Sequence, residues 1–234
     1  MLMRFKTRAT TGVTRLCALL PKRLLNRLPL LYYPYDKFMH RYQCVFVHIP
    51  KNAGSSVLKA FDSNSVRWHA KAIEYKRAST YFYHRYYKFA VVREPLARLY
   101  SSYCYAKNGG NQQVDDLAFQ QHLLDNSTDF SSFIQQVLSY DVLFQQTIFQ
   151  PQYWYIFDKQ HCCQMDKLLR YETLAEDWHT LAKKRKFPTN LPWVNASANK
   201  PKSLPSINEA AKQKVYELYY YDFKLLGYPI PSVK

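Results

Sequence analysis

The sequence predicts an α/β fold in which helices flank a central, mainly parallel sheet. Two near-continuous apolar runs, Tyr42–Ile49 and Tyr87–Val92, are typical of strands that are buried on both faces. Each run ends at a loop and is followed by apolar residues at helical spacing. Strands that alternate with helices in this way are joined by helical crossovers and lie parallel.

The other elements follow from the same patterns. The first helix is expected to begin near Val57, after the loop that ends the first strand. A second begins at Pro95, because proline is favoured at the first helical position, and Gly109-Gly110 ends it. Further helices are expected at Val114–Leu124, Asp129–Ser139, Gln145–Phe157, Leu174–Lys184 and Asn208–Leu226, with a short strand at Asp166–Arg170.

The composition is that of one folded domain with a basic surface. Of the 234 residues, 47% are hydrophobic and 17% aromatic, which excludes a disordered tail protein. The formal net charge of +16 favours an anionic partner. Residues 1–40 carry eight of the cations and a single acid, Asp36. We therefore expect a basic N-terminal arm over residues 1–40 and one domain over residues 41–234.

The five cysteines include no CxxC pair, so we expect reduced thiols and no zinc site. Residues 14–31 alternate Leu with Arg and Lys, a pattern typical of amphipathic helices on an anionic membrane surface. A solvated basic arm explains the same pattern equally well, and the acid-free composition also resembles a transit peptide. No run approaches the roughly 18 consecutive apolar residues of a membrane span.

The first strand leads into a small-residue loop that is suited to an anion. Lys51-Asn52-Ala53-Gly54-Ser55-Ser56 lies between a strand and a helix start, where backbone N–H groups and the positive helix end face one phosphate-like group. Lys51 adds a mobile cation, and the two serines add hydroxyl donors. The loop differs from GxxxxGK[ST] because Lys51 precedes the glycine. An ordinary strand–helix turn would explain Gly54 but not the lysine and the paired serines.

The second strand leads into another motif that is suited to an anion. Arg93 lies at the strand end, and the helix that follows carries Arg98 and Ser101. Arg93 and Ser101 together would grip a second phosphate. Taken alone, this motif is equally compatible with a surface helix that makes ordinary ion pairs.

Together the two motifs resemble those of the sulfotransferase family, in particular its glycan branch with its bacterial-type relatives. The family's VR[DNE]PxxRLxSxY motif is matched by Val92, Arg93, Glu94, Pro95, Arg98, Leu99, Ser101 and Tyr103. Pieces that resemble its PQ, RYExLxxD, LPxxN and YxDFxxxGY segments follow in order at Pro151-Gln152, Leu169–Asp177, Leu191–Asn195 and Tyr221–Tyr228. The resemblance covers roughly residues 42–228 and implies a P-loop-like three-layer fold.

The resemblance also implies a donor, 3′-phosphoadenosine 5′-phosphosulfate (PAPS), a product, 3′-phosphoadenosine 5′-phosphate (PAP), and no metal. The first loop would hold the 5′-phosphosulfate, with Lys51 at the sulfonate. Arg93 and Ser101 would bind the 3′-phosphate, Tyr171 would lie near the adenine, and Lys200 would assist. The expected donor-binding residues are Lys51, Asn52, Ala53, Gly54, Ser55, Ser56, Arg93, Ser101, Tyr171 and Lys200.

In-line transfer of a sulfuryl group to an acceptor hydroxyl needs a general base. His69, in Trp68-His69-Ala70-Lys71-Ala72, resembles the HAxA-type segment of bacterial relatives and is the expected base beside the catalytic Lys51. His84 and Glu74 are the alternatives. His48, within the first strand, is expected to be a packed residue.

An acidic saccharide is the expected acceptor, because Arg and Lys pair with its charges while aromatic rings stack on sugars. Tyr81–Tyr87 and Gln145–Tyr155 are candidate acceptor walls. Two other classes stay open: a basic nucleotide- or nucleic-acid-binding module, and a P-loop kinase-like phosphotransferase. The sequence carries no RNP, KH or zinc-finger signature, so no nucleic acid is expected.

The absence of an anchor argues against the Golgi lumen, where eukaryotic glycan relatives work. We therefore expect a cytoplasmic enzyme, with residues 14–31 as the segment that would rest on the inner membrane.

Overall fold

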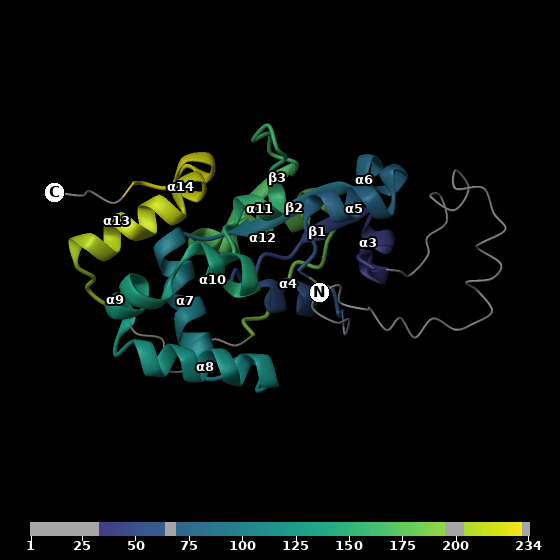
Figure 1. Ribbon diagram of the computed structural model, residues 1–234. Helices are drawn as coiled ribbons and strands as arrows, with labels where there is room; N and C mark the ends of the chain where they lie inside the picture. Colours follow the sequence, from purple (N-terminus) through teal and green to yellow (C-terminus); the bar gives the residue numbers. More distant parts are fainter. Residues whose placement is uncertain (1–32, 64–68, 195–203, 231–234) are drawn as a thin grey trace.

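The computed structural model describes residues 33–63, 69–194 and 204–230 (Figure 1). Within these residues, β1 (Cys44–Val47), β2 (Tyr87–Val92) and β3 (Lys167–Arg170) form one parallel sheet in the order β1-β2-β3. All three strands therefore end at the same edge. The predicted α/β fold with a parallel sheet between helices is confirmed.

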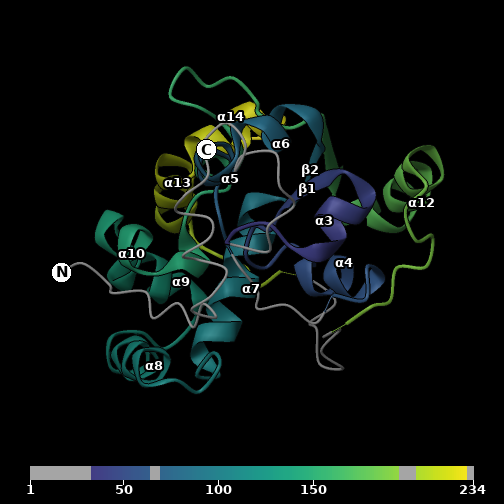
Figure 2. The ribbon, with the colours of Figure 1, turned by 90° about the vertical axis from the view of Figure 1, so that its right-hand side faces the viewer.

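Helices surround the sheet on its sides and ends. Figure 2 shows α12 on one side of the strands and α13 and α14 on the other. The helices of the described residues are α3 (Lys37–Tyr42), α4 (Gly54–Ala60), α5 (Ala72–Ala78), α6 (Thr80–Arg85), α7 (Pro95–Lys107), α8 (Val114–Asn126), α9 (Phe130–Ser132), α10 (Tyr140–Gln145), α11 (Tyr153–Ile156), α12 (Leu174–Arg185), α13 (Glu209–Leu218) and α14 (Tyr220–Leu226). A π-helical turn (Phe133–Val137) and two 3₁₀ turns (Thr147–Phe149 and Tyr171–Thr173) complete them.

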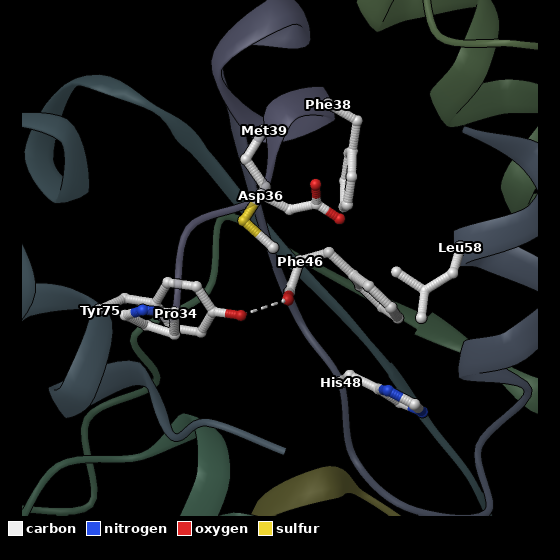
Figure 3. A pocket seen from close by; sticks show the side chains of 8 residues that line it. All are labelled: Pro34, Asp36, Phe38, Met39, Phe46, His48, Leu58 and Tyr75. Atoms are coloured by element: carbon white, nitrogen blue, oxygen red, sulfur yellow. Dashed lines mark hydrogen bonds between the residues drawn. The ribbon is translucent and has the colours of Figure 1, made fainter. Parts of the chain in front are cut away.

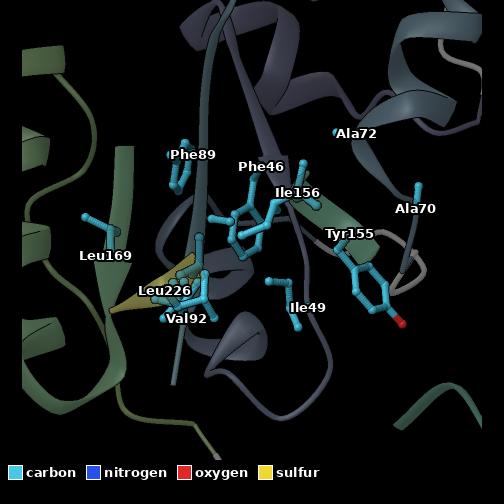
Figure 4. Packing of buried hydrophobic residues seen from close by; sticks show 14 of the residues in the cluster. Phe46, Ile49, Ala70, Ala72, Phe89, Val92, Tyr155, Ile156, Leu169 and Leu226 are labelled. Atoms are coloured by element: carbon cyan, nitrogen blue, oxygen red, sulfur yellow. The ribbon is translucent and has the colours of Figure 1, made fainter. Parts of the chain in front are cut away.

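The core is built around the strands and is rich in aromatic rings (Figure 4). All four residues of β1 are buried, as are the last four of β2. Phe46 and Phe89 face each other across the register of β1 and β2, with ring centroids 5.1 Å apart. Trp178 of α12 is fully buried, and its indole N–H donates to the carbonyl of Pro188 at 3.1 Å.

Two predicted helices are broken in the structure. The helix expected at Gln145–Phe157 is wrong: α10 ends at Gln145, and α11 starts only at Tyr153. Pro151 lies in the gap, and Gln150 before it is extended (φ −54°, ψ 137°), as the proline ring requires. The helix expected at Asn208–Leu226 is divided at Tyr219. Helices α5 and α6 were not predicted.

The expected arm falls largely outside the described residues, including the whole of 14–31. Its last part, from residue 33 to residue 40, packs on the domain, because Tyr35, Phe38 and Met39 are buried. The division at residue 40 stays a prediction. Among the residues that the structure describes, no helix is long and apolar enough to cross a membrane.

Candidate functional site

The two motifs meet at the edge where the strands end, and the first of them forms a tight turn before α4. Lys51 and Ala53 both adopt the left-handed backbone (φ 70° and 58°), which non-glycine residues rarely populate. Turns of this kind gather successive N–H groups into a concavity that suits an anion. Helix α4 starts directly at Gly54, and Ala53 before it has no side chain that could cap it.

Gly54 lets the loop pass close to His48. A Cβ at this position would overlap Nε2 and Cδ2 of the His48 ring, and Cε1 would lie only 2.6 Å away. His48 itself is 6% exposed, in line with its expected role as a packed residue. The glycine is therefore required by close packing between the loop and the strand end.

Arg93 links the second motif to the first. Its Nη1 donates to the carbonyl of Lys51 at 3.3 Å, and its guanidinium lies 4.1 Å from the ring centroid of Tyr171. Its Nε is buried and has no hydrogen-bond partner among the described residues. Burial lowers the pKa of Arg93, while Tyr171 and Glu172 oppose this shift. The result is a partly desolvated cation beside the loop, which an incoming anion would stabilise.

The side chain of Gln152 is hydrogen-bonded to both motifs. Its Oε1 accepts from the backbone N–H of Arg93 (3.0 Å) and from Nδ2 of Asn52 (2.7 Å). Its Nε2 donates to the carbonyl of Arg93 at 2.7 Å. Asn52 also donates to the carbonyl of Val91 at 2.8 Å, so its side chain points into the protein. Gln152 and Asn52 are both buried, and they set the spacing between the two strand ends.

A second buried layer supports this network. The Asp222 carboxylate accepts from the backbone N–H groups of Gln152 and Tyr153, each at 2.8 Å. Burial raises the pKa of Asp222, and the nearby Arg98 and these two hydrogen bonds oppose the shift. Arg98 is fully buried and donates to the carbonyls of Pro50 (3.2 Å) and Gln150 (2.5 Å). The interpretation of the second motif as a surface helix therefore fails for Arg98, which anchors the first loop.

The remaining predicted donor-binding residues differ in exposure. Lys51 is half-buried, with Nζ 4.2 Å from the ring centroid of Tyr105. Ser56 is 1% exposed, and its Oγ accepts from the N–H of Val194 at 3.1 Å, so it ties a distant segment to the loop. Ser55 and Ser101 are half-buried. Lys200 lies outside the described residues.

An aromatic corner flanks Arg93. Tyr171 packs edge-on against Trp193, with ring centroids 6.4 Å apart at 83°. Trp193 is 54% exposed. Sequence reasoning selected Tyr171 and missed Trp193, although a tryptophan directly after Leu191-Pro192 in a polar loop was a visible signal.

His69 is held at the same edge by the end of the first strand. Its Nδ1 lies 3.1 Å from the carbonyl oxygen of His48. Because a carbonyl can only accept, Nδ1 carries a proton, and a neutral His69 ring would have its lone pair on Nε2. The rings of His69 and His48 lie 4.4 Å apart between centroids. This tautomer is the one a general base needs.

The two alternative bases, His84 and Glu74, lie away from the loop or are held by other hydrogen bonds. His84 is exposed near the end of α6, just before β2 begins. It is therefore separated from the loop by the length of β2, roughly 20 Å. Glu74 caps α5: it accepts from the backbone N–H of Lys71 at 2.7 Å and from the hydroxyl of Tyr33 at 2.8 Å.

A small cavity lies behind His48, away from the loop (Figure 3). Its volume is about 20 Å³, enough for about one water molecule. Its lining is mainly apolar and includes Phe46, Leu58 and Tyr75, whose hydroxyl donates to the carbonyl of Phe46 at 3.1 Å. A nucleotide does not fit in this cavity.

A parallel α/β sheet with a tight turn after one strand and a desolvated arginine after the next has an edge that is suited to phosphate-like groups. The chain matches the family model described as Sulfotransferase family over residues 37–229. It therefore belongs to the sulfotransferase family and is a sulfotransferase. No curated protein and no solved structure matches it.

Proposed function

We propose that the enzyme transfers a sulfuryl group from PAPS to a hydroxyl of an acidic saccharide, with His69 as general base. The observation that carries the donor assignment is the contact between the two motifs, in which Arg93 reaches the Lys51 carbonyl from the neighbouring strand end. One ligand with two anionic groups would engage both motifs at once. Family membership favours this chemistry over the kinase-like and binding-only alternatives.

The donor would lie along the edge of the sheet. The turn at residues 51–56 would bind the 5′-phosphosulfate, with Lys51 on the sulfonate, and Arg93 and Ser101 would bind the 3′-phosphate. The adenine would lie beside Tyr171 and the exposed ring of Trp193. Lys200 keeps its proposed role near the 3′-phosphate.

Proton transfer would run through Nε2 of His69. His69 takes the proton from the acceptor hydroxyl as its oxygen attacks the sulfur, and the bond between the sulfur and the 5′-phosphate oxygen breaks. Lys51 and the N–H groups of the turn stabilise the charge on the sulfonate and on the leaving phosphate. The hydrogen bond to the His48 carbonyl holds the ring in the required tautomer and stabilises the imidazolium that forms.

Calorimetry with PAP tests the donor site. We expect Lys51→Ala and Arg93→Ala each to weaken PAP binding at least tenfold, because each removes a cation from the site. His69→Ala should bind PAP like the wild type, since it acts on the acceptor. Unchanged affinity in both cation variants would overturn the donor assignment.

The cellular setting is part of the same proposal. We propose a cytoplasmic enzyme whose residues 14–31 contact an anionic membrane surface. Removal of residues 1–32 should abolish co-sedimentation with anionic vesicles, and it should leave PAP affinity unchanged. Retained co-sedimentation would remove the proposed role of this segment.

A further inference from the structure

A row of aromatic rings, two of them largely exposed, runs from α10 to α11. Tyr140 and Phe144 are 61% and 66% exposed, and they share one face of α10 because they are four residues apart. The Phe144 ring packs against Trp154 of α11, with centroids 4.9 Å apart at 34°. Exposed apolar surface that gathers in one place marks a binding site more often than scattered single residues do.

Lys71 connects this row to His69. Its Nζ lies 5.2 Å from the ring centroid of Trp154 and 5.6 Å from that of Tyr155. The backbone at Lys71 is extended (φ −81°, ψ 157°), and Ala70 before it is fully buried beside the core residue Tyr155 (Figure 4). His69 precedes Lys71 by two residues, so the candidate base and this ammonium group belong to one short segment.

The ammonium group of Lys71 makes no ion pair within the part of the chain that the structure describes. No carboxylate of the described residues lies within ion-pair distance of its Nζ; the ion pairs found there are Lys88–Asp166 and Lys212–Glu209. The nearest acid in sequence, Glu74, is held by the Lys71 backbone N–H and the Tyr33 hydroxyl. Burial lowers the pKa of Lys71, although Glu74 opposes the shift.

The exposed rings and the unpaired ammonium group are complementary to an acidic saccharide. The apolar face of a sugar ring packs on aromatic rings, and a carboxylate or sulfate pairs with an ammonium group. Tyr140 and Phe144 are about 6 Å apart along α10, and Trp154 extends the row, so it is longer than one sugar ring. A single sugar would leave part of it uncovered.

We propose that Tyr140, Phe144, Trp154 and Lys71 form the acceptor subsite, which binds an acidic oligosaccharide with an anionic group at Lys71, next to the hydroxyl that His69 activates. This inference rests on the proposed function and deepens it. Of the two walls that the sequence suggested, the subsite takes Trp154 from Gln145–Tyr155 and nothing from Tyr81–Tyr87, which runs from α6 into the start of β2 at the opposite edge of the sheet.

The test uses the full-length protein and a tetrasaccharide of alternating glucuronate and N-acetylhexosamine. Direct binding is measured by calorimetry in the presence of PAP, and turnover is measured with PAPS. We expect Trp154→Ala to weaken tetrasaccharide binding and raise its KM at least tenfold, while PAP affinity stays within twofold of the wild type. Tyr81→Ala is the matched control, because it removes an exposed ring from the opposite edge and should change neither value.

Lys71→Met tests the charge. The variant should lose at least tenfold in affinity for the tetrasaccharide and little for its carboxyl-reduced form, which has no charge. Lys59→Met, an exposed lysine of α4, should behave like the wild type with both ligands. Circular dichroism and thermal unfolding check that each variant is folded, and Phe144→Ala replaces Trp154→Ala if the latter fails.

The outcomes distinguish a failure of the proposed subsite from a failure of the proposed sulfuryl transfer. If the wild type binds the tetrasaccharide, and Trp154→Ala and Lys71→Met bind it equally well, the subsite is wrong even where turnover occurs. Absence of tetrasaccharide binding by the wild type also overturns it. If binding depends on these residues but no sulfuryl group is transferred, the subsite stands and the proposed function fails.

Discussion

Gly54→Ala tests whether the loop depends on close packing with His48. The new methyl group would overlap two atoms of a buried ring and lie 2.6 Å from a third, so the ring or the loop must move. Overpacking of this kind costs about 1–3 kcal/mol. In an ordinary helix, alanine would instead be favoured over glycine by about 1 kcal/mol. We therefore expect a lower free energy of unfolding, where helix propensity alone predicts a gain.

The effect reaches the site because the residue that Gly54 packs against also supplies the carbonyl that accepts from His69 Nδ1. A shift of the His48 backbone or of the loop that relieves the clash would move this carbonyl or the turn. Gly54→Ala should therefore weaken PAP binding and lower kcat together. Urea unfolding gives the stability change, and a loss of about 1 kcal/mol corresponds to about 2–4 °C in Tm for a domain of this size.

A double-mutant cycle tests whether the overlap with the His48 ring causes the loss of stability. In a His48→Ala background the ring is absent, so Gly54→Ala should cost nothing or stabilise the fold. If the alanine costs the same in both backgrounds, or nothing in the wild type, the packing explanation is refuted.

Two further changes probe the buried network. Gln152→Leu removes three hydrogen bonds and leaves Asn52 and Arg93 with buried polar groups unpaired, so it should cost about 2–5 kcal/mol in urea unfolding; a loss below 1 kcal/mol would contradict the bridging role. Asp222 has a raised pKa when folded, so the native state binds its proton more tightly than the unfolded state does. Protonated Asp222 therefore contributes stability that is fully present below its ordinary pKa and is lost as the pH rises through the raised value. Asp222→Asn should flatten that acidic part of the stability profile, and an unchanged profile would exclude Asp222 as its source.

The sequence was sufficient for the parts of the fold that local pattern determines. Apolar runs located β1 and β2, and parallel pairing then required the loops at Lys51 and Arg93 to meet at one edge, as they do. The break at Pro151 was also visible, but helical periodicity was extended across it. That error shows that a proline outweighs a few apolar residues at helical spacing.

The supporting contacts could not be predicted, because they join residues that are far apart in the chain. Asn52 and Gln152 are separated by 100 positions, and Asp222 lies 70 beyond Gln152. The sequence was compatible with Arg98 on a surface helix, and only its hydrogen bond to the carbonyl of Pro50 identifies it as a buried anchor. The exposed row at Tyr140 and Phe144 likewise depends on how α10 sits against Trp154.

The most direct test of the account is transfer of labelled sulfate from PAPS to the acidic tetrasaccharide, with analysis of both products by mass. The wild type should form a sulfated tetrasaccharide and an equal amount of PAP, and His69→Ala should bind PAP normally but lose at least a hundredfold in kcat. Full turnover in His69→Ala would contradict the assigned base. PAP release without any sulfated saccharide would contradict the central claim.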